Sequence, residues 1–101
     1  MIYGVVSVRV KPGKLEEFLQ LFKSVAPTVR EEKGCLEYMP LVDMEIKGVP
    51  QSLDKDVVTI IEKWESLEAL RAHAVSPHMA EFHKKERDLV EGVSLKMLKE
   101  A

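Results

Sequence analysis

Four short segments rich in β-branched and apolar residues are separated along this chain by segments in which apolar residues recur at helical spacing. Residues 2–10, 35–42, 57–64 and 93–98 are β-branched and apolar in a pattern typical of strands. Apolar residues in 15–29 recur at helical spacing, with charged residues on the other side. This succession of patterns restricts the chain to a fold in which helices cover a sheet.

Punctuating residues predict where the helices begin and end. Ser66 is a good N-cap for a helix that follows the third strand, although only half of the capping box is present. Pro77, preceded by Ser76, is placed to start a further helix, and Gly92 is expected to end it. Pro27 lies within the long first helix and is expected to kink or end it.

The predicted order is β-α-β-β-α-α-β, which is the ferredoxin-like arrangement of the α+β class. It has a four-stranded antiparallel sheet with helices on one face. The chain has 101 residues, so residues 1–101 are expected to form a single domain. Residues 43–56 carry glycine, proline and charge and are predicted to be a loop.

The predicted strands carry apolar residues on both faces, while helices are available for only one. In residues 57–64 neither alternating set is clearly polar, and residues 2–10 carry valines on both sides. A solvated sheet face is normally polar. The sequence therefore predicts a homodimer in which two sheets pack face to face.

Charge and composition exclude several classes of partner. The formal net charge is −2, from 15 Lys and Arg against 17 Asp and Glu, so no nucleic acid or membrane partner is expected. No apolar run approaches the ~20 residues of a membrane span. Residues 1–10 fit a strand better than a signal peptide, and Cys35 is the only cysteine, so a cytoplasmic location is expected. No glycine-rich phosphate loop is present.

Several motifs in order resemble the antibiotic biosynthesis monooxygenase family. They are EKWESLEAL at residues 62–70, followed by Ala72-His73 and Ser76-Pro77-His78-Met79, with KPGK at 11–14 and GCLEY at 34–38. The resemblance implies a dimeric α/β barrel with a pocket between sheet and helices. It also implies oxygenation of phenols or quinols by O₂ with no metal or flavin cofactor. Other relatives cleave heme, and one isomerises a phosphorylated sugar.

Several aromatic and histidine side chains are candidates for the site, and the resemblance implies a role for Trp64 and His83. Trp64 would line the pocket and orient a planar substrate, although a tryptophan at the end of a strand is also a common core residue. His73 is a candidate general base or hydrogen-bond partner, or else a half-buried structural histidine. His83 corresponds by spacing to the heme-ligating histidine of heme-degrading relatives, but an exposed position fits it equally. Phe22, Met79 and Phe82 are the candidate pocket walls.

The spacing of the three histidines argues against a metal site. His73, His78 and His83 are five residues apart, and five residues of a helix turn through ~140°, so they would not share one face. His78 is interpreted as structural. We therefore expect no three-histidine metal centre.

Two departures from the family select among its activities. Heme-degrading relatives have an asparagine in the first strand, where this chain has Val6, Ser7 and Val8, and polyketide oxygenases have one at the position of Ile60. The favoured hypothesis is a cofactor-independent monooxygenase acting on a small quinol-like or phenolic substrate with O₂. An isomerase of a small carbonyl metabolite and a non-enzymatic dimeric ligand-binding module remain alternatives, and heme degradation is less favoured.

Overall fold

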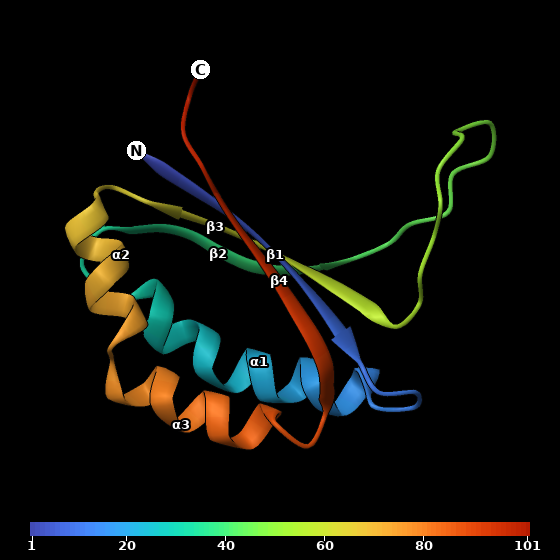
Figure 1. Cartoon of the computed structure of the whole chain (residues 1–101), viewed down its shortest axis with the longest axis horizontal. Helices are drawn as coiled ribbons and strands as arrows, with labels where there is room; N and C mark the ends of the chain where they lie inside the picture. The colour runs from blue at the N-terminus through green and yellow to red at the C-terminus, as the bar shows by residue number, and fades with distance from the viewer.

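The computed structural model describes all 101 residues and has the predicted order of elements (Figure 1). Four strands form one antiparallel sheet in the order β2-β3-β1-β4. The element bounds are β1 Ile2–Val10, α1 Leu15–Arg30, β2 Cys35–Val42, β3 Val57–Trp64, α2 Leu67–Ala74, α3 Pro77–Glu86 and β4 Val90–Leu98. The ferredoxin-like α+β prediction is therefore confirmed. None of the three helices has the length and apolar content that a membrane span requires.

All three helices lie against one face of the sheet, which we call the inner face (Figure 1). Every second residue of β3 points to that face, as the burial of Val58, Ile60, Glu62 and Trp64 shows. Burial of the apolar members of this set beneath the helices stabilises the fold by about 25 cal/mol per Å² of apolar surface. The core consists of Val8, Val10, Phe18, Phe22, Ala26, Val29, Tyr38, Val58, Ile60, Trp64, Met79, Phe82 and Leu89.

The prediction that Gly92 ends a helix was wrong, and of the two outcomes expected at Pro27, the end of the helix does not occur. The helix α1 continues to Arg30, and the Glu31 amide still donates to the Pro27 carbonyl at 3.2 Å. The proline removes one donor, but helical bonding resumes beyond it. Gly92 does not end a helix either. The helix α3 stops at Glu86, Leu89 turns into the core, and Gly92 pairs with Arg9 inside β4.

The face of the sheet opposite the helices, the outer face, is less apolar than the sequence suggested. One row across three strands is apolar, since Met39 pairs with Ile61 and Ile61 with Val5, but Lys96 completes that row. The neighbouring row is Leu41, Thr59, Ser7 and Ser94. The homodimer through this face remains a prediction.

Three exposed apolar side chains of β4 lie on the inner face. By register Val93, Leu95 and Met97 stand opposite Val8, Val6 and Gly4, so they point toward the helices. No helix covers them, and they are 55%, 62% and 38% exposed. They form an open apolar edge beside the helices.

Residues 43–56 form the predicted loop, which projects away from the body of the molecule (Figure 1). It turns at Gly48, whose φ of +87° lies in the left-handed region that glycine tolerates. An ion pair of 2.6 Å between Arg9 and Asp54 connects the loop to β1. The Arg9 guanidinium lowers the pKa of the Asp54 carboxyl through this hydrogen bond.

Candidate functional site

A cavity of about 420 Å³ lies between the inner face of the sheet and the helices α2 and α3. Eleven of its sixteen lining residues are hydrophobic, and Val93, Leu95 and Met97 of β4 form one of its sides. Small-molecule sites are typically apolar clefts of ~300–1,000 Å³ with a few polar groups. The other five lining residues are Glu62, Arg71, His73, His83 and Glu86, and Tyr38, one of the eleven, adds a phenol hydroxyl.

Glu62 is a buried carboxylate on the inner face of β3, only 5% exposed. Trp64 Nε1 donates a hydrogen bond of 2.9 Å to Glu62 Oε1. The other oxygen, Oε2, has no hydrogen-bond partner in the protein. Every fully buried side-chain oxygen has such a partner, so Oε2 is not fully buried. Since Glu62 lines the cavity, Oε2 is accessible from it.

The glycine opposite Glu62 leaves room for this carboxylate. Gly4 of β1 pairs with Glu62, and a Cβ at Gly4 would lie 2.5 Å from Glu62 Cγ. It would also approach Met97 Cε to 3.2 Å. Glycine at this position therefore allows the Glu62 side chain to pass over β1.

Trp64 is fully buried and is not among the residues that line the cavity. Its ring packs against that of His73 with centroids 4.6 Å apart, and its N–H holds Glu62. In this structure Trp64 therefore affects the cavity through Glu62 and His73. The predicted direct stacking of Trp64 on a substrate would require a movement that exposes its ring.

His73 lies in the last turn of α2 and lines the cavity, with its ring between those of Trp64 and Tyr38. Its Nδ1 is 2.9 Å from Glu32 Oε2. A carboxylate only accepts hydrogen bonds, so Nδ1 carries the hydrogen, and in the neutral imidazole Nε2 keeps its lone pair. Nε2 has no protein partner and is not fully buried, so it is a second acceptor accessible from the cavity.

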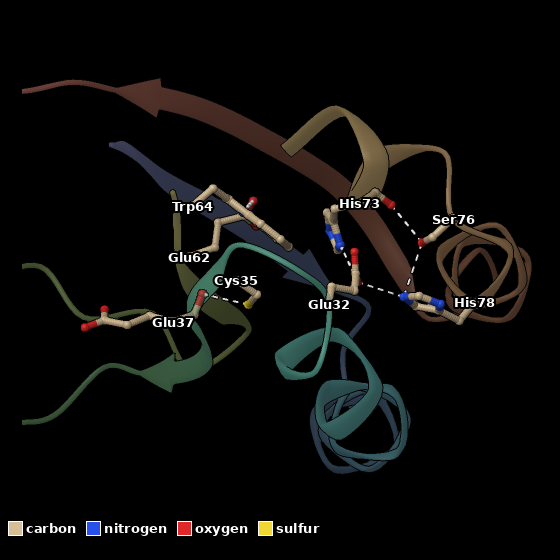
Figure 2. Close-up of polar contacts among 8 residues, drawn as sticks. All are labelled: Glu32, Cys35, Glu37, Glu62, Trp64, His73, Ser76 and His78. Carbon is tan, nitrogen blue, oxygen red and sulfur yellow. Dashed lines mark hydrogen bonds and ion pairs between the residues drawn. The ribbon is translucent and has the colours of Figure 1, made fainter. Parts of the chain in front are cut away.

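His78 joins the same carboxylate from α3, as Figure 2 shows. Its Nε2 lies 2.8 Å from Glu32 Oε2 and 3.2 Å from Ser76 Oγ, while the Ser76 hydroxyl donates to the His73 carbonyl at 2.8 Å. The expectation that spacing keeps His73 and His78 apart was wrong. The chain breaks between α2 and α3, so the rotation of a continuous helix does not apply.

The remaining predicted residues divide between the cavity and the core. Met79 and Phe82 line the cavity. Phe22 is fully buried behind it, stacked on Tyr38 with ring centroids 4.9 Å apart. His83 also lines the cavity, but its side chain is 58% exposed and its Nδ1 lies 3.1 Å from Glu86 Oε1.

Sequence reasoning missed Glu62, Glu32 and the role of Tyr38 as a lining residue. Glu62 could have been found, because it lies in the same alternating set as Ile60 and Trp64. Glu32 gave no local signal, since its partners are more than 40 residues away. Cys35 is a free thiol near this region, and burial followed by the charge of Glu32 raises its pKa.

The free energy of unfolding is expected to fall at alkaline pH because of the buried phenol of Tyr38. Burial, followed by the negative charge of Glu62, raises the pKa of the Tyr38 phenol well above its ordinary value of ~10. The folded state therefore keeps a proton that the unfolded chain releases above that pH. This stabilisation is complete below pH ~10 and declines above it by up to ~1.4 kcal/mol per pH unit.

The measurement is urea unfolding of the unaltered chain and of Tyr38→Phe between neutral and strongly alkaline pH. The free energy of unfolding of the unaltered chain should fall relative to that of the variant as pH rises. Parallel pH profiles for the two proteins would contradict this expectation.

The fold and the cavity define a ferredoxin-like α+β protein with a small-molecule pocket. The family model for "Antibiotic biosynthesis monooxygenase" matches residues 1–85. The chain is 37% identical over 81 residues to the Escherichia coli K12 protein named "Probable quinol monooxygenase YgiN", covering 78% of each chain. The chain therefore belongs to the antibiotic biosynthesis monooxygenase family.

Solved structures agree with the fold. A protein from Bacteroides thetaiotaomicron has a TM-score of 0.80 at 27% identity, covering 96% of this chain and 94% of that chain. A conserved protein from Methanosarcina mazei has a TM-score of 0.85 at 24% identity, covering 99% of this chain and 92% of that chain. The second likeness concerns the fold alone.

Proposed function

We propose that this protein is a monooxygenase that oxidises a small quinol-like or phenolic substrate with O₂. The observation that carries the proposal is the pair of acceptors in an apolar cavity, Glu62 Oε2 and His73 Nε2. A quinol presents two hydroxyl donors on a flat apolar ring, which matches two acceptors and apolar walls. The resemblance to a quinol monooxygenase supports the same substrate class.

The two acceptors would have different roles in the reaction. Glu62 would take the proton of one hydroxyl, because its carboxylate is held by Trp64 and its free oxygen is accessible from the cavity. His73, fixed through Nδ1 by Glu32, would accept a hydrogen bond from the other hydroxyl at Nε2. Loss of the proton makes the ring electron-rich, so that O₂ can react with it. Met79 and Phe82 would restrict the ring to the plane of the cavity.

The electron balance closes with substrate and O₂ alone. A benzenediol gives four electrons and O₂ accepts four. One oxygen atom bonds to a ring carbon and the other leaves as water, which yields a hydroxylated quinone. No external reductant enters this equation.

The experiment is O₂ uptake by the purified protein with a series of hydroquinones and simple phenols. We expect uptake faster than the uncatalysed rate, saturating with quinol and ending when O₂ is removed. Failure to accelerate oxidation of any member of the series would reject this substrate class. Turnover of a small carbonyl compound without O₂ would favour an isomerase instead.

A further inference from the structure

Three side chains, one from the turn after α1 and one each from α2 and α3, converge on one another (Figure 2). Glu32 follows α1, His73 belongs to α2 and His78 to α3. Glu32 Oε2 lies 2.9 Å from His73 Nδ1 and 2.8 Å from His78 Nε2, and the three atoms are all within 4.8 Å of one another. We call these residues the Glu32 cluster.

The chemistry of the Glu32 cluster suits a transition metal. Two imidazole nitrogens and one carboxylate oxygen are ligands for Zn²⁺ and related divalent ions, whereas Mg²⁺ and Ca²⁺ prefer oxygen alone. The side chains of Glu32, His73 and His78 are 15%, 8% and 26% exposed, so an ion here would be sheltered but reachable. Glu32 and His78 do not line the cavity.

We infer that the Glu32 cluster binds one divalent first-row transition metal ion through Glu32 Oε2, His73 Nδ1 and His78 Nε2. Zinc bonds of ~2.0–2.2 Å in tetrahedral geometry place ligand atoms roughly 3.3–3.6 Å apart. Each oxygen–nitrogen separation in the cluster is 2.8–2.9 Å, so small side-chain rotations open space for the ion. Water completes the coordination.

Metal binding at the Glu32 cluster requires no change in the number of protons on the two histidines. Without the ion, the two ring nitrogens that face Glu32 Oε2 donate their hydrogens to it. To bind the ion, each neutral imidazole carries its hydrogen on the other ring nitrogen, and the first nitrogen offers its lone pair. The ion therefore replaces two N–H donors without removing a proton from a neutral histidine.

The bound ion would join the end of α1 to α2 and α3. Because only the folded chain brings these residues together, the ion stabilises the folded state by mass action. Zn²⁺ binding can be measured without any substrate. The result of that measurement does not depend on the proposed oxygenase activity. With the ion bound, His73 Nε2 carries the hydrogen and cannot accept a bond from a substrate hydroxyl, so the acceptor role proposed for His73 belongs to the metal-free chain.

The test is competition for Zn²⁺ between the chelator-treated, desalted protein and a chromophoric zinc indicator near neutral pH. We expect one ion per chain and a rise in Tm with Zn²⁺. Loss of a second-shell partner alone costs about 10–100-fold in metal affinity. His78→Gln, which removes a ligand, should therefore weaken binding by at least about 100-fold.

The matched control is His83→Gln, which removes the other histidine of α3, outside the Glu32 cluster. It should bind Zn²⁺ like the unaltered chain. Glu32→Gln is a second ligand variant of equal size, with circular dichroism confirming that each variant is folded. Equal affinity in His78→Gln and the unaltered chain, loss of affinity in His83→Gln, or no stoichiometric binding by the unaltered chain would each overturn the metal site.

Discussion

Glu62→Gln is expected to lower kcat for quinol-dependent O₂ uptake by at least about 100-fold, the usual contribution of a general base. The amide keeps the volume of the side chain and can still accept the Trp64 N–H, so the fold should be preserved. It cannot take a proton from the substrate hydroxyl. KM should change less than kcat, because the amide oxygen still accepts a hydrogen bond in the cavity.

The control for this substitution is Glu65→Gln, which removes a carboxylate three residues away at an exposed position. Steady-state O₂ uptake over a range of quinol concentrations compares the two variants. Glu65→Gln should retain full activity. If Glu62→Gln retained a kcat within a few-fold of the unaltered chain, Glu62 would not be the proton acceptor.

Trp64→Ala is expected to lower the free energy of unfolding by about 3–5 kcal/mol, the usual cost of deleting a buried aromatic ring. Trp64 is fully buried and packs on His73. Its removal leaves a cavity and also deprives the buried Glu62 carboxylate of its donor. Since small domains have ~5–15 kcal/mol of stability, this is a large fraction of the total.

The free energy of unfolding is measured by urea unfolding, and an m-value equal to that of the unaltered chain shows that stability alone has changed. Trp64→Phe keeps one aromatic ring and removes the N–H donor, so it leaves a smaller cavity than Trp64→Ala and weights the loss toward the missing hydrogen bond. We expect a smaller loss of about 1–3 kcal/mol for leaving a buried acceptor without its partner. A loss below about 1 kcal/mol for Trp64→Ala would show that the ring does not have the packing role that its burial implies.

Most of the fold could be predicted because hydrophobic period and turn chemistry are local. The bounds of β1, β2 and β3 and the loop at 43–56 follow from alternation and from glycine and proline. Ser66 caps α2 as expected, with its Oγ accepting from the Ala69 amide at 3.1 Å. The prediction at Gly92 was wrong because glycine is common after a helix but is also tolerated in an edge strand such as β4.

The candidate site was harder to predict because it depends on tertiary contacts. The sequence identified His73, Met79 and Phe82, which line the cavity, and Trp64, which lies behind it. Glu62 was not selected from the sequence as a site residue. It could have been selected, because it alternates with Ile60 and Trp64 on the buried face of β3. Glu32 could not be connected to His73 from sequence, because that contact requires the end of α1 to meet α2.

Single-turnover oxidation of a hydroquinone in isotopically labelled O₂, followed by mass spectrometry of the product, tests the proposed activity most directly. The proposed reaction predicts one labelled oxygen atom bound to carbon in each product molecule, with the other in water. It also predicts that Glu62→Gln forms little labelled product. Enzyme-dependent formation of an unlabelled quinone, or no product above the protein-free reaction, would contradict monooxygenase activity toward this substrate class.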